Sequence, residues 1–257
     1  MAERGLVVLP EQVPAATGQD TLTVLPVEEL QDTAFLFTDS NILRATREAE
    51  VWYQTCGHKL TFSLENVKTK SGIQPTDAMF WGSMTVQLTP EQSALVQKHV
   101  DDIIFLMAYA NREPMMRQHG WHIEKPYDLR LLYRGLVQEG VEKLDDLDGK
   151  PQLEPDCITG NVAMRLSRKH RLKANKRECR VEDLLGRPFR SCDLRGKMLR
   201  KVVVQVDKVV FFKTPSIPIR VDCSFRNIVV NEAAPTYPPK RRKHASGASK
   251  KKKARAE

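Results

Sequence analysis

The fold class is decided by residues 202–226, which read Val-Val-Val-Gln-Val-Asp-Lys-Val-Val-Phe-Phe-Lys-Thr-Pro-Ser-Ile-Pro-Ile-Arg-Val-Asp-Cys-Ser-Phe-Arg. The first part is rich in β-branched and aromatic residues, which predicts a strand over Val202–Phe212. The last part alternates apolar and polar residues, so Ile217–Arg226 is expected to be a strand with one buried face. Lys213–Ser216 between them contains a proline and predicts a hairpin loop.

Two further strands and one long helix precede this hairpin. His58–Glu65 and Ser83–Leu88 alternate in the same manner and predict strands. Thr89 is a natural N-cap, and Pro90 and Gln92 complete a capping-box start. Apolar residues at helical spacing follow, so a helix is predicted over 90–112.

The order of these elements predicts a mixed α+β, β-rich fold. In element order alone it resembles the OB-fold, a five-stranded barrel, with the helix between its third and fourth strands. The first strand would be 34–46 or 51–57. Residues 113–200 would form a large basic insertion, with helices around Asp128–Val141 and Asn161–Lys169. A separate subdomain, or another mixed α+β fold, is the alternative.

The 257 residues divide into three regions. Residues 1–33, rich in Pro, Gln and Thr, predict an extended N-terminal arm. Residues 34–234 form a single predicted domain, with 113–200 inserted in it. Residues 235–257 contain almost nothing to bury and predict a disordered basic tail.

Charge is distributed unevenly along the chain, whose formal net charge is +9. Residues 235–257 hold nine Lys or Arg and one acid, a net charge of +8. Residues 165–201 hold fourteen Lys or Arg against four acids, so the rest of the chain is acidic. The overall charge is therefore weak evidence for a binding site, and the 165–201 stretch is better evidence.

Lysines and arginines of the 165–201 stretch are candidate phosphate contacts, because cations at this density release counterions from a nucleic-acid backbone. The candidates are Arg165, Arg168, Lys169, Arg171, Lys173, Lys176 and Arg177. The alternative is a solvated helix face with ordinary ion pairs.

Aromatic residues near strand starts are candidate stacking platforms for unpaired bases. They are Trp52, Tyr53 and Trp81; packing in the core is the alternative for each ring. Arg220 and Arg226 lie on the polar side of the predicted strand Ile217–Arg226. They are either phosphate contacts or part of a solvent face.

Two compact cationic clusters in the tail match nuclear import signals and also suit phosphate binding. The clusters are Lys240, Arg241, Arg242 and Lys243, and Lys250, Lys251, Lys252 and Lys253. They predict a nuclear import receptor as partner and a nuclear location, which would be the host nucleus for a viral protein.

Several classes of protein have no support in the sequence. The longest apolar run, Ile103–Ala110, is too short to span a bilayer, so no membrane association is expected. The five cysteines are scattered without a Cys-x-x-Cys pair, which predicts reduced thiols and no metal site. No phosphate-binding loop, dinucleotide fingerprint or nucleophile elbow is present, so we expect no cofactor and no enzyme activity.

Two functions remain open. The first is sequence-independent binding of nucleic acid, DNA rather than RNA, in single-stranded form during replication or repair in the nucleus. The alternative is a structural DNA-packaging component, either a viral core protein or a chromatin-associated factor, whose tail binds duplex DNA. The sequence leaves the oligomeric state open.

Overall fold

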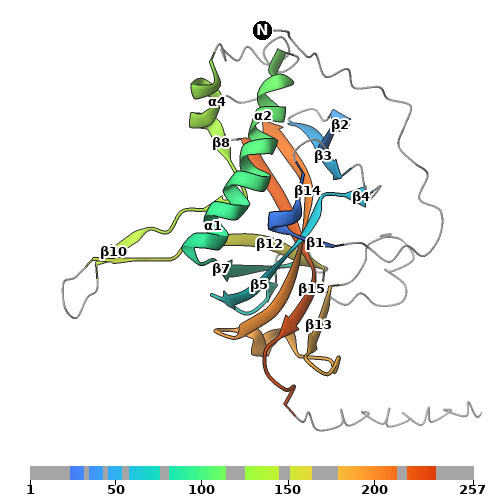
Figure 1. Cartoon of the computed structure of the whole chain (residues 1–257), viewed down its shortest axis with the longest axis vertical. Helices are drawn as coiled ribbons and strands as arrows, with labels where there is room; N and C mark the ends of the chain where they lie inside the picture. Colours follow the sequence, from blue (N-terminus) through green and yellow to red (C-terminus); the bar gives the residue numbers. More distant parts are fainter. Residues whose placement is uncertain are drawn as a thin grey trace, which may run out of the picture.

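The computed structural model describes residues 24–31, 35–42, 46–53, 58–75, 81–113, 125–144, 151–163, 179–212 and 219–235. The protein is β-rich and mixed α+β, with one long helix lying against a curved sheet (Figure 1). The strands are β1 (Leu25–Pro26), β2 (Phe35–Ile42), β3 (Thr46–Tyr53), β4 (His58–Lys59), β5 (Thr61–Thr69), β6 (Gln74–Pro75), β7 (Trp81–Gln87), β8 (Tyr133–Arg134), β9 (Val137–Gln138), β10 (Glu142–Leu144), β11 (Pro151–Leu153), β12 (Cys157–Ala163), β13 (Arg180–Asp183), β14 (Met198–Phe212) and β15 (Ile219–Val230). The helical segments are η1 (Val27–Glu29), α1 (Pro90–Val96), η4 (Gln97–Asp101), α2 (Asp102–Ala110), α4 (Pro126–Leu132) and η5 (Ser191–Leu194).

The predicted hairpin strands are confirmed as β14 and β15, which pair antiparallel over most of their lengths. Val206 pairs with Cys223 and Val209 with Val221, so the apolar sides of both strands face the core. Register shifts interrupt the ladder and bend the strands. The predicted loop Lys213–Ser216 lies outside the described residues.

Strand pairing returns to its starting point within the described residues. β5 pairs with β7, β7 with β12, β12 with β15, β15 with β14, and β14 again with β5. The β12–β15 pairing is parallel and the others are antiparallel. The β5–β7 and β12–β15 contacts are the short ones, each joining two residue pairs.

The strand β12 corrects two predictions. Residues 157–163 form a strand, so the predicted helix beginning at Asn161 is wrong for its described part. Here pairing with β7 and β15 decides the backbone conformation, because a short apolar segment has no strong local preference. The long helix therefore lies between the second and third strands of the closed pairing order, not between the third and fourth. Residues 113–200 contribute β8, β9, β12 and β13 to the main sheet.

The long helix is confirmed, with a π-helical interruption. Thr89 and Gln92 form the predicted capping box, and the helix ends at Ala110. In η4, the backbone N–H of Asp102 bonds to the carbonyl of Gln97, five residues earlier, as in a π-turn. Val96, Val100 and Ile104 are fully buried against the sheet. Among the described residues, no helix is long and apolar enough to cross a membrane.

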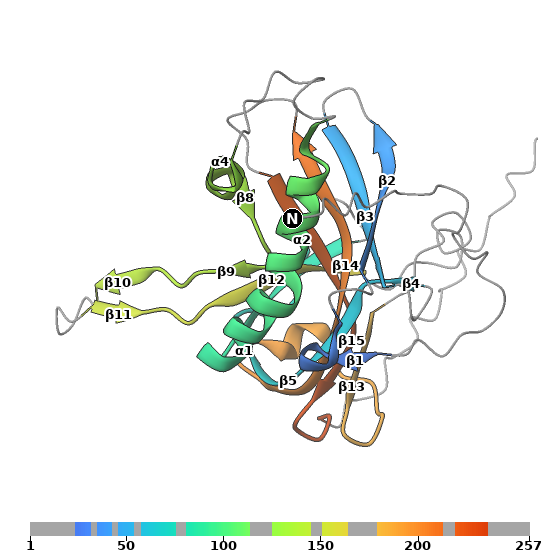
Figure 2. The same cartoon turned by 45° about the horizontal axis from the view of Figure 1, so that its top comes forward.

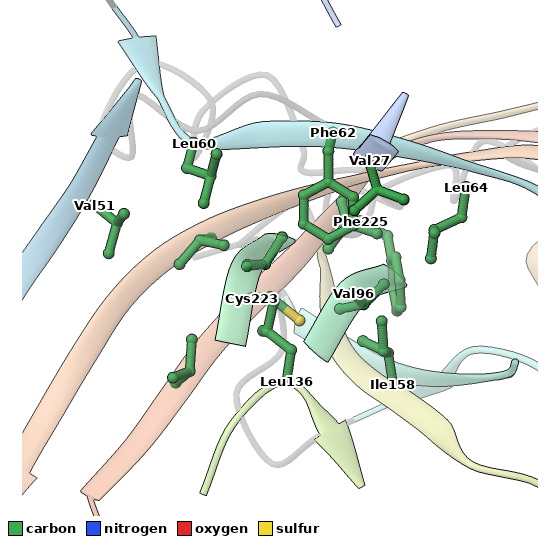
Figure 3. Close-up of a cluster of buried hydrophobic side chains, with 14 of the residues drawn as sticks. Val27, Val51, Leu60, Phe62, Leu64, Val96, Leu136, Ile158, Cys223 and Phe225 are labelled. Atoms are coloured by element: carbon green, nitrogen blue, oxygen red, sulfur yellow. The ribbon is translucent and has the colours of Figure 1, made fainter. Parts of the chain in front are cut away.

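The core fills the space between the sheet and the helix. Figure 3 shows Phe62 of β5 and Phe225 of β15 in one cluster with Val96 of the helix. Ile158 of β12 belongs to the same cluster. A Cβ at Gly160 would lie 2.8 Å from Cε2 of Phe225, so a glycine is needed where that ring packs on β12.

The N-terminal part of the chain departs from the prediction in two ways. β2 and β3 form a hairpin that extends the sheet beyond β14. Both ranges proposed for the first strand, 34–46 and 51–57, therefore contain strand residues. Val27 and Leu30, in the predicted N-terminal arm, are buried in the core, and β1 pairs with β5. The described part of the arm, residues 24–31, is therefore packed on the domain.

A two-stranded arm of β10 and β11 projects from the body (Figure 2). Asp156 holds its base, because its carboxylate accepts hydrogen bonds from Gly140 N at 3.0 Å and from Ser93 Oγ at 2.5 Å. Glu154 pairs with Lys70 at 2.8 Å beside it. The arm is thus anchored to the helix and to β5, and its strands lie away from the core.

Candidate nucleic-acid interface

The outer surface of β14 and β15 carries the predicted polar face. Arg220, Asp222 and Arg226 alternate with buried residues along β15, as predicted, whereas Ser224, on the same side of the strand, is buried. Trp52 of β3 is half-buried and pairs in register with Lys59 of β4. We define the polar sheet face as Glu48, Glu50, Trp52, Lys59, Gln205, Asp207, Lys208, Arg220, Asp222, Ser224 and Arg226.

Asp207 is the centre of the polar sheet face. Its carboxylate accepts hydrogen bonds from Ser224 Oγ and Gln205 Nε2, both at 2.9 Å. Lys59 Nζ donates to its backbone carbonyl at 3.1 Å, and Arg226 lies 3.9 Å from the carboxylate. Burial raises the pKa of Asp207, although these hydrogen bonds and the Arg226 charge oppose the shift. This network connects Lys59 to Arg226.

Cations on the polar sheet face are matched by acids. Its ion pairs are Lys59 with Glu50 at 2.7 Å, Lys208 with Glu48, Arg220 with Asp222 at 2.6 Å, and Arg226 with Asp207 at 3.9 Å. Arg220 also lies over the ring of Phe212, 5.8 Å from its centroid. Because the charges cancel locally, this surface offers little net attraction to phosphates.

A second surface lies where β5 and β15 end, where β14 begins, and at the end of β13. The register places these points together, because Lys68 pairs with Met198, and Val230 pairs with both Leu199 and Asp183. Figure 1 shows β13 beside this end of the sheet.

We define the arginine end by its exposed arginines, which are Arg180, Arg187, Arg190, Arg195 and Arg200. Arg187 pairs with Asp183 at 2.7 Å. Arg180, Arg195 and Arg200 form no ion pair with any residue that the structure describes. Residues 179–201 hold seven Lys or Arg and three acids. The arginine end, unlike the polar sheet face, therefore carries a net positive charge.

The predicted aromatic residues have different positions. Tyr53 is 3% exposed; its ring meets Phe35 edge-on, and its hydroxyl accepts a hydrogen bond from Gln31 N at 2.9 Å. Its ring is thus a core residue with no open face for a base, which corrects the stacking role predicted for it. Trp52 is half-buried, and its ring Nε1 is buried without a hydrogen-bond partner among the described residues. The backbone of Trp81 pairs with Ala163 at the end of β12, immediately before the basic stretch begins in the sequence.

The remaining predicted site residues lie outside the described residues. They are Arg165, Arg168, Lys169, Arg171, Lys173, Lys176 and Arg177, and the tail clusters Lys240–Lys243 and Lys250–Lys253. The exposed arginines of the arginine end belong to the same basic stretch, 165–201. The density of charge in this stretch indicates these arginines as candidates. It does not indicate their arrangement, because that depends on the turn after β13, which the sequence analysis does not predict.

A buried carboxylate outside these surfaces explains why the second predicted helix is short. Asp101, 6% exposed, accepts hydrogen bonds from Leu136 N at 2.8 Å and Val137 N at 3.0 Å. Burial raises its pKa to about 6, and the two N–H groups oppose the shift. A Cβ at Gly135 would clash with this carboxylate. Residues 133–138 therefore cross the long helix as short strands, and the helix predicted over Asp128–Val141 ends at Leu132.

Metal ligands are not grouped in the described part of the chain, where no three His, Cys, Asp or Glu side chains could hold an ion together.

The sequence matches no protein-family profile and no curated protein. Among solved structures, the chain is similar to the C-terminally truncated single-stranded DNA-binding protein of bacteriophage Enc34, at 11% identity and a TM-score of 0.40. That match covers 78% of this chain and 98% of the other. It is also similar to gp2.5, a single-stranded DNA-binding protein encoded by bacteriophage T7, at 14% identity and a TM-score of 0.40, covering 70% and 91% of the two chains. At these values the likeness is not evidence for a shared function.

Proposed function

We propose that the protein is a non-enzymatic nucleic-acid-binding protein that holds single-stranded DNA without sequence preference. The observation that carries this proposal is the arginine end, where Arg180, Arg195 and Arg200 are exposed and free of ion pairs with described residues. Exposed arginines without acidic partners suit phosphates, because each phosphate that they neutralise releases a counterion.

The strand order supports the choice of a single-stranded ligand. We infer an OB-fold-like barrel from the closed pairing order β5–β7–β12–β15–β14 and its parallel β12–β15 contact. Barrels of this class bind oligonucleotides on their strand faces and loops. The position of the helix, between the second and third strands, departs from the layout expected from the sequence.

A salt titration tests the site. We expect Arg180→Ala, Arg195→Ala and Arg200→Ala together to weaken binding of an unstructured oligothymidine. The slope of log affinity against log salt should fall by about 2, since each lost single-strand phosphate contact removes about 0.7. Fluorescence anisotropy at several salt concentrations measures this slope.

The matched control removes the same number of charges from the polar sheet face. Lys59→Ala, Lys208→Ala and Arg220→Ala remove cations that have acidic partners. The slope of this triple variant should stay close to that of the wild type. If the slope changed equally in both triple variants, the arginine end would have no special role in binding.

The packaging alternative rests on the tail, whose two clusters are cationic enough to neutralise duplex DNA. We keep nuclear import, through Lys240–Lys243 and Lys250–Lys253, as a proposal for the same segment. Removal of the tail separates these proposals from binding by the folded domain.

A further inference from the structure

The turn after β13 displays two neighbouring leucines to solvent. Leu184 is 53% exposed and Leu185 is 74% exposed. We call this pair the leucine tip. The chain turns at Asp183-Leu-Leu-Gly186, where Gly186 N donates to Asp183 O at 3.0 Å, and Gly186 takes a φ of +73°. Asp at the first position and a left-handed glycine at the last are the residues that such a hairpin turn prefers.

The backbone beneath the leucine tip is held in place by Asp183, which is 1% exposed. One carboxylate oxygen accepts hydrogen bonds from Leu185 N at 2.9 Å and Arg187 N at 2.8 Å. The other accepts from Arg187 Nε at 2.7 Å and from Ala234 N at 2.8 Å. The tip is thus tied both to the segment that returns from the turn, at Arg187, and to the segment that follows β15, at Ala234.

A fixed apolar tip among cations has a specific use on a nucleic acid. Exposed leucines lose the favourable free energy of burial, so a rigid turn that presents two of them suits a surface that will cover them. Arg180 lies on β13, and Arg190 lies on the segment that returns from the turn; both are exposed, and Arg187 is half exposed. Apolar side chains flanked by cations can insert between bases while the cations hold the phosphates.

We propose that the leucine tip is a wedge that inserts between bases at the junction of single- and double-stranded DNA and promotes strand separation. This proposal rests on the function proposed above and adds an activity to it. No covalent step or energy source is involved, because the wedge stabilises the unstacked junction and the arginine end holds the released strand.

One other exposed apolar residue, Met198 (41% exposed), lies at the arginine end, at the start of β14, but it is not on the turn. Exposed apolar residues elsewhere have a different setting. Leu153 and Val141 belong to the projecting arm. Residues 139–156 of that region contain seven acids and two lysines, which would repel phosphates. Leu131 lies on α4, where Arg130 is paired with Asp102 at 2.9 Å. Charge thus favours the leucine tip as the apolar contact for DNA.

The test compares the full-length wild type with the variant Leu184→Ala/Leu185→Ala. The substrate is a short duplex with a single-stranded overhang, labelled so that strand separation changes energy transfer. We expect the protein concentration for half-maximal separation to rise about tenfold, equivalent to about 1.4 kcal/mol. Affinity for unstructured oligothymidine should change less than about twofold, since phosphate contacts provide most of it.

The matched control is Leu131→Ala/Leu153→Ala, whose side chains are 58% and 74% exposed. This variant should separate strands like the wild type. Leu185→Phe, which keeps the tip apolar, should retain the activity. Unchanged thermal unfolding of all variants would show that they fold.

The outcomes separate the wedge from the proposed function. Strand separation by the tip variant at the wild-type concentration would overturn the wedge and leave single-strand binding intact. An equal loss of separation and oligothymidine affinity would make the tip an ordinary binding contact, which also overturns it. No oligothymidine binding by the wild type would instead refute the proposed function. In another outcome, the tip variant would separate strands like the wild type but lose the binding of the wild type to anionic phosphatidylserine vesicles. That result would assign the tip to a lipid surface and reject the wedge.

Discussion

At the residue scale, two buried carboxylates hold two crossing points of the chain, and their pKa values shift in opposite directions. Burial raises the pKa of Asp101 to about 6, because two backbone N–H groups do not fully replace water. Burial also disfavours the charged form of Asp183. Hydrogen bonds from Ala234, Arg187 and Leu185 outweigh it and hold the pKa of Asp183 below its usual range. The difference follows from the number and charge of the donors.

The pKa of Asp101 predicts a pH dependence of stability. The Asp101 carboxylate binds a proton more tightly in the folded protein than in the unfolded chain, where the pKa of Asp is about 3.9. This contribution is fully present below about pH 4 and is lost as the pH rises through about 6. We expect the free energy of unfolding of the wild type to fall by about 3 kcal/mol relative to Asp101→Asn over this range.

Urea unfolding of both proteins between pH 4 and pH 7 measures this difference. Subtracting the two curves of unfolding free energy against pH removes the contribution of Asp183, which both proteins share. That contribution to stability is lost as the pH falls. Parallel curves for the two proteins would mean that Asp101 does not titrate in this range.

At the element scale, β12 is tightly constrained by its neighbours. A Cβ at Gly160 would lie 2.8 Å from Phe225 and 3.1 Å from Sγ of Cys223, both buried. We expect Gly160→Ala to lower the free energy of unfolding by about 1–3 kcal/mol, because the ring must move in a filled core. Chemical denaturation measures the change.

The control for Gly160→Ala is Asn161→Ala, the exposed next residue of the same strand. Its effect should stay within about 0.5 kcal/mol. Equal effects of the two substitutions would show that the backbone of β12, and not the packing of Phe225, limits this position.

The types of the elements were predictable where local signals are strong. The pairing partners of the strands were not. The alternation along Ser83–Leu88 and the capping box at Thr89 are local, and both predictions are confirmed. β5 departs from its predicted polar face, because Thr61 and Ser63 are buried as well. Strands β12 and β13 depend on pairing with strands distant in the sequence, which periodicity does not reveal.

The candidate site was predictable only in part for the same reason. Arg220 and Arg226 lie on the polar side of β15 as predicted, but their charge is cancelled by acids. The pair Lys208 and Glu48 lies 160 residues apart in the sequence, so no local pattern indicates it. The turn Asp183–Gly186 did carry a local signal, an Asp followed three residues later by Gly.

At the scale of the whole molecule, charge is divided among the cationic arginine end, the acidic projecting arm of β10 and β11, and the cationic tail. We expect deletion of residues 235–257 to weaken DNA binding and flatten its salt dependence, because nine cations are lost. Preference for single over double strands should remain if the folded domain is the site. A fluorescent fusion of the same deletion should also fail to accumulate in nuclei.

Competition binding with oligothymidine and a duplex of equal length measures this preference. Complete loss of binding on deletion would favour the packaging alternative. Unchanged nuclear accumulation would remove the import role of the tail.

The π-turn in the long helix has an evolutionary consequence. A π-turn holds one residue more than the α-helical turn it replaces, so the helix on either side of it keeps its faces. Loss of a single residue from Gln97–Asp101 would close this wide turn into a regular α-helical turn and leave the buried Ile104 facing the core. Loss of Asp101 itself would also remove the carboxylate that accepts the hydrogen bond from Leu136 N. Descendants of this chain can therefore shorten the turn by one residue as long as they keep Asp101.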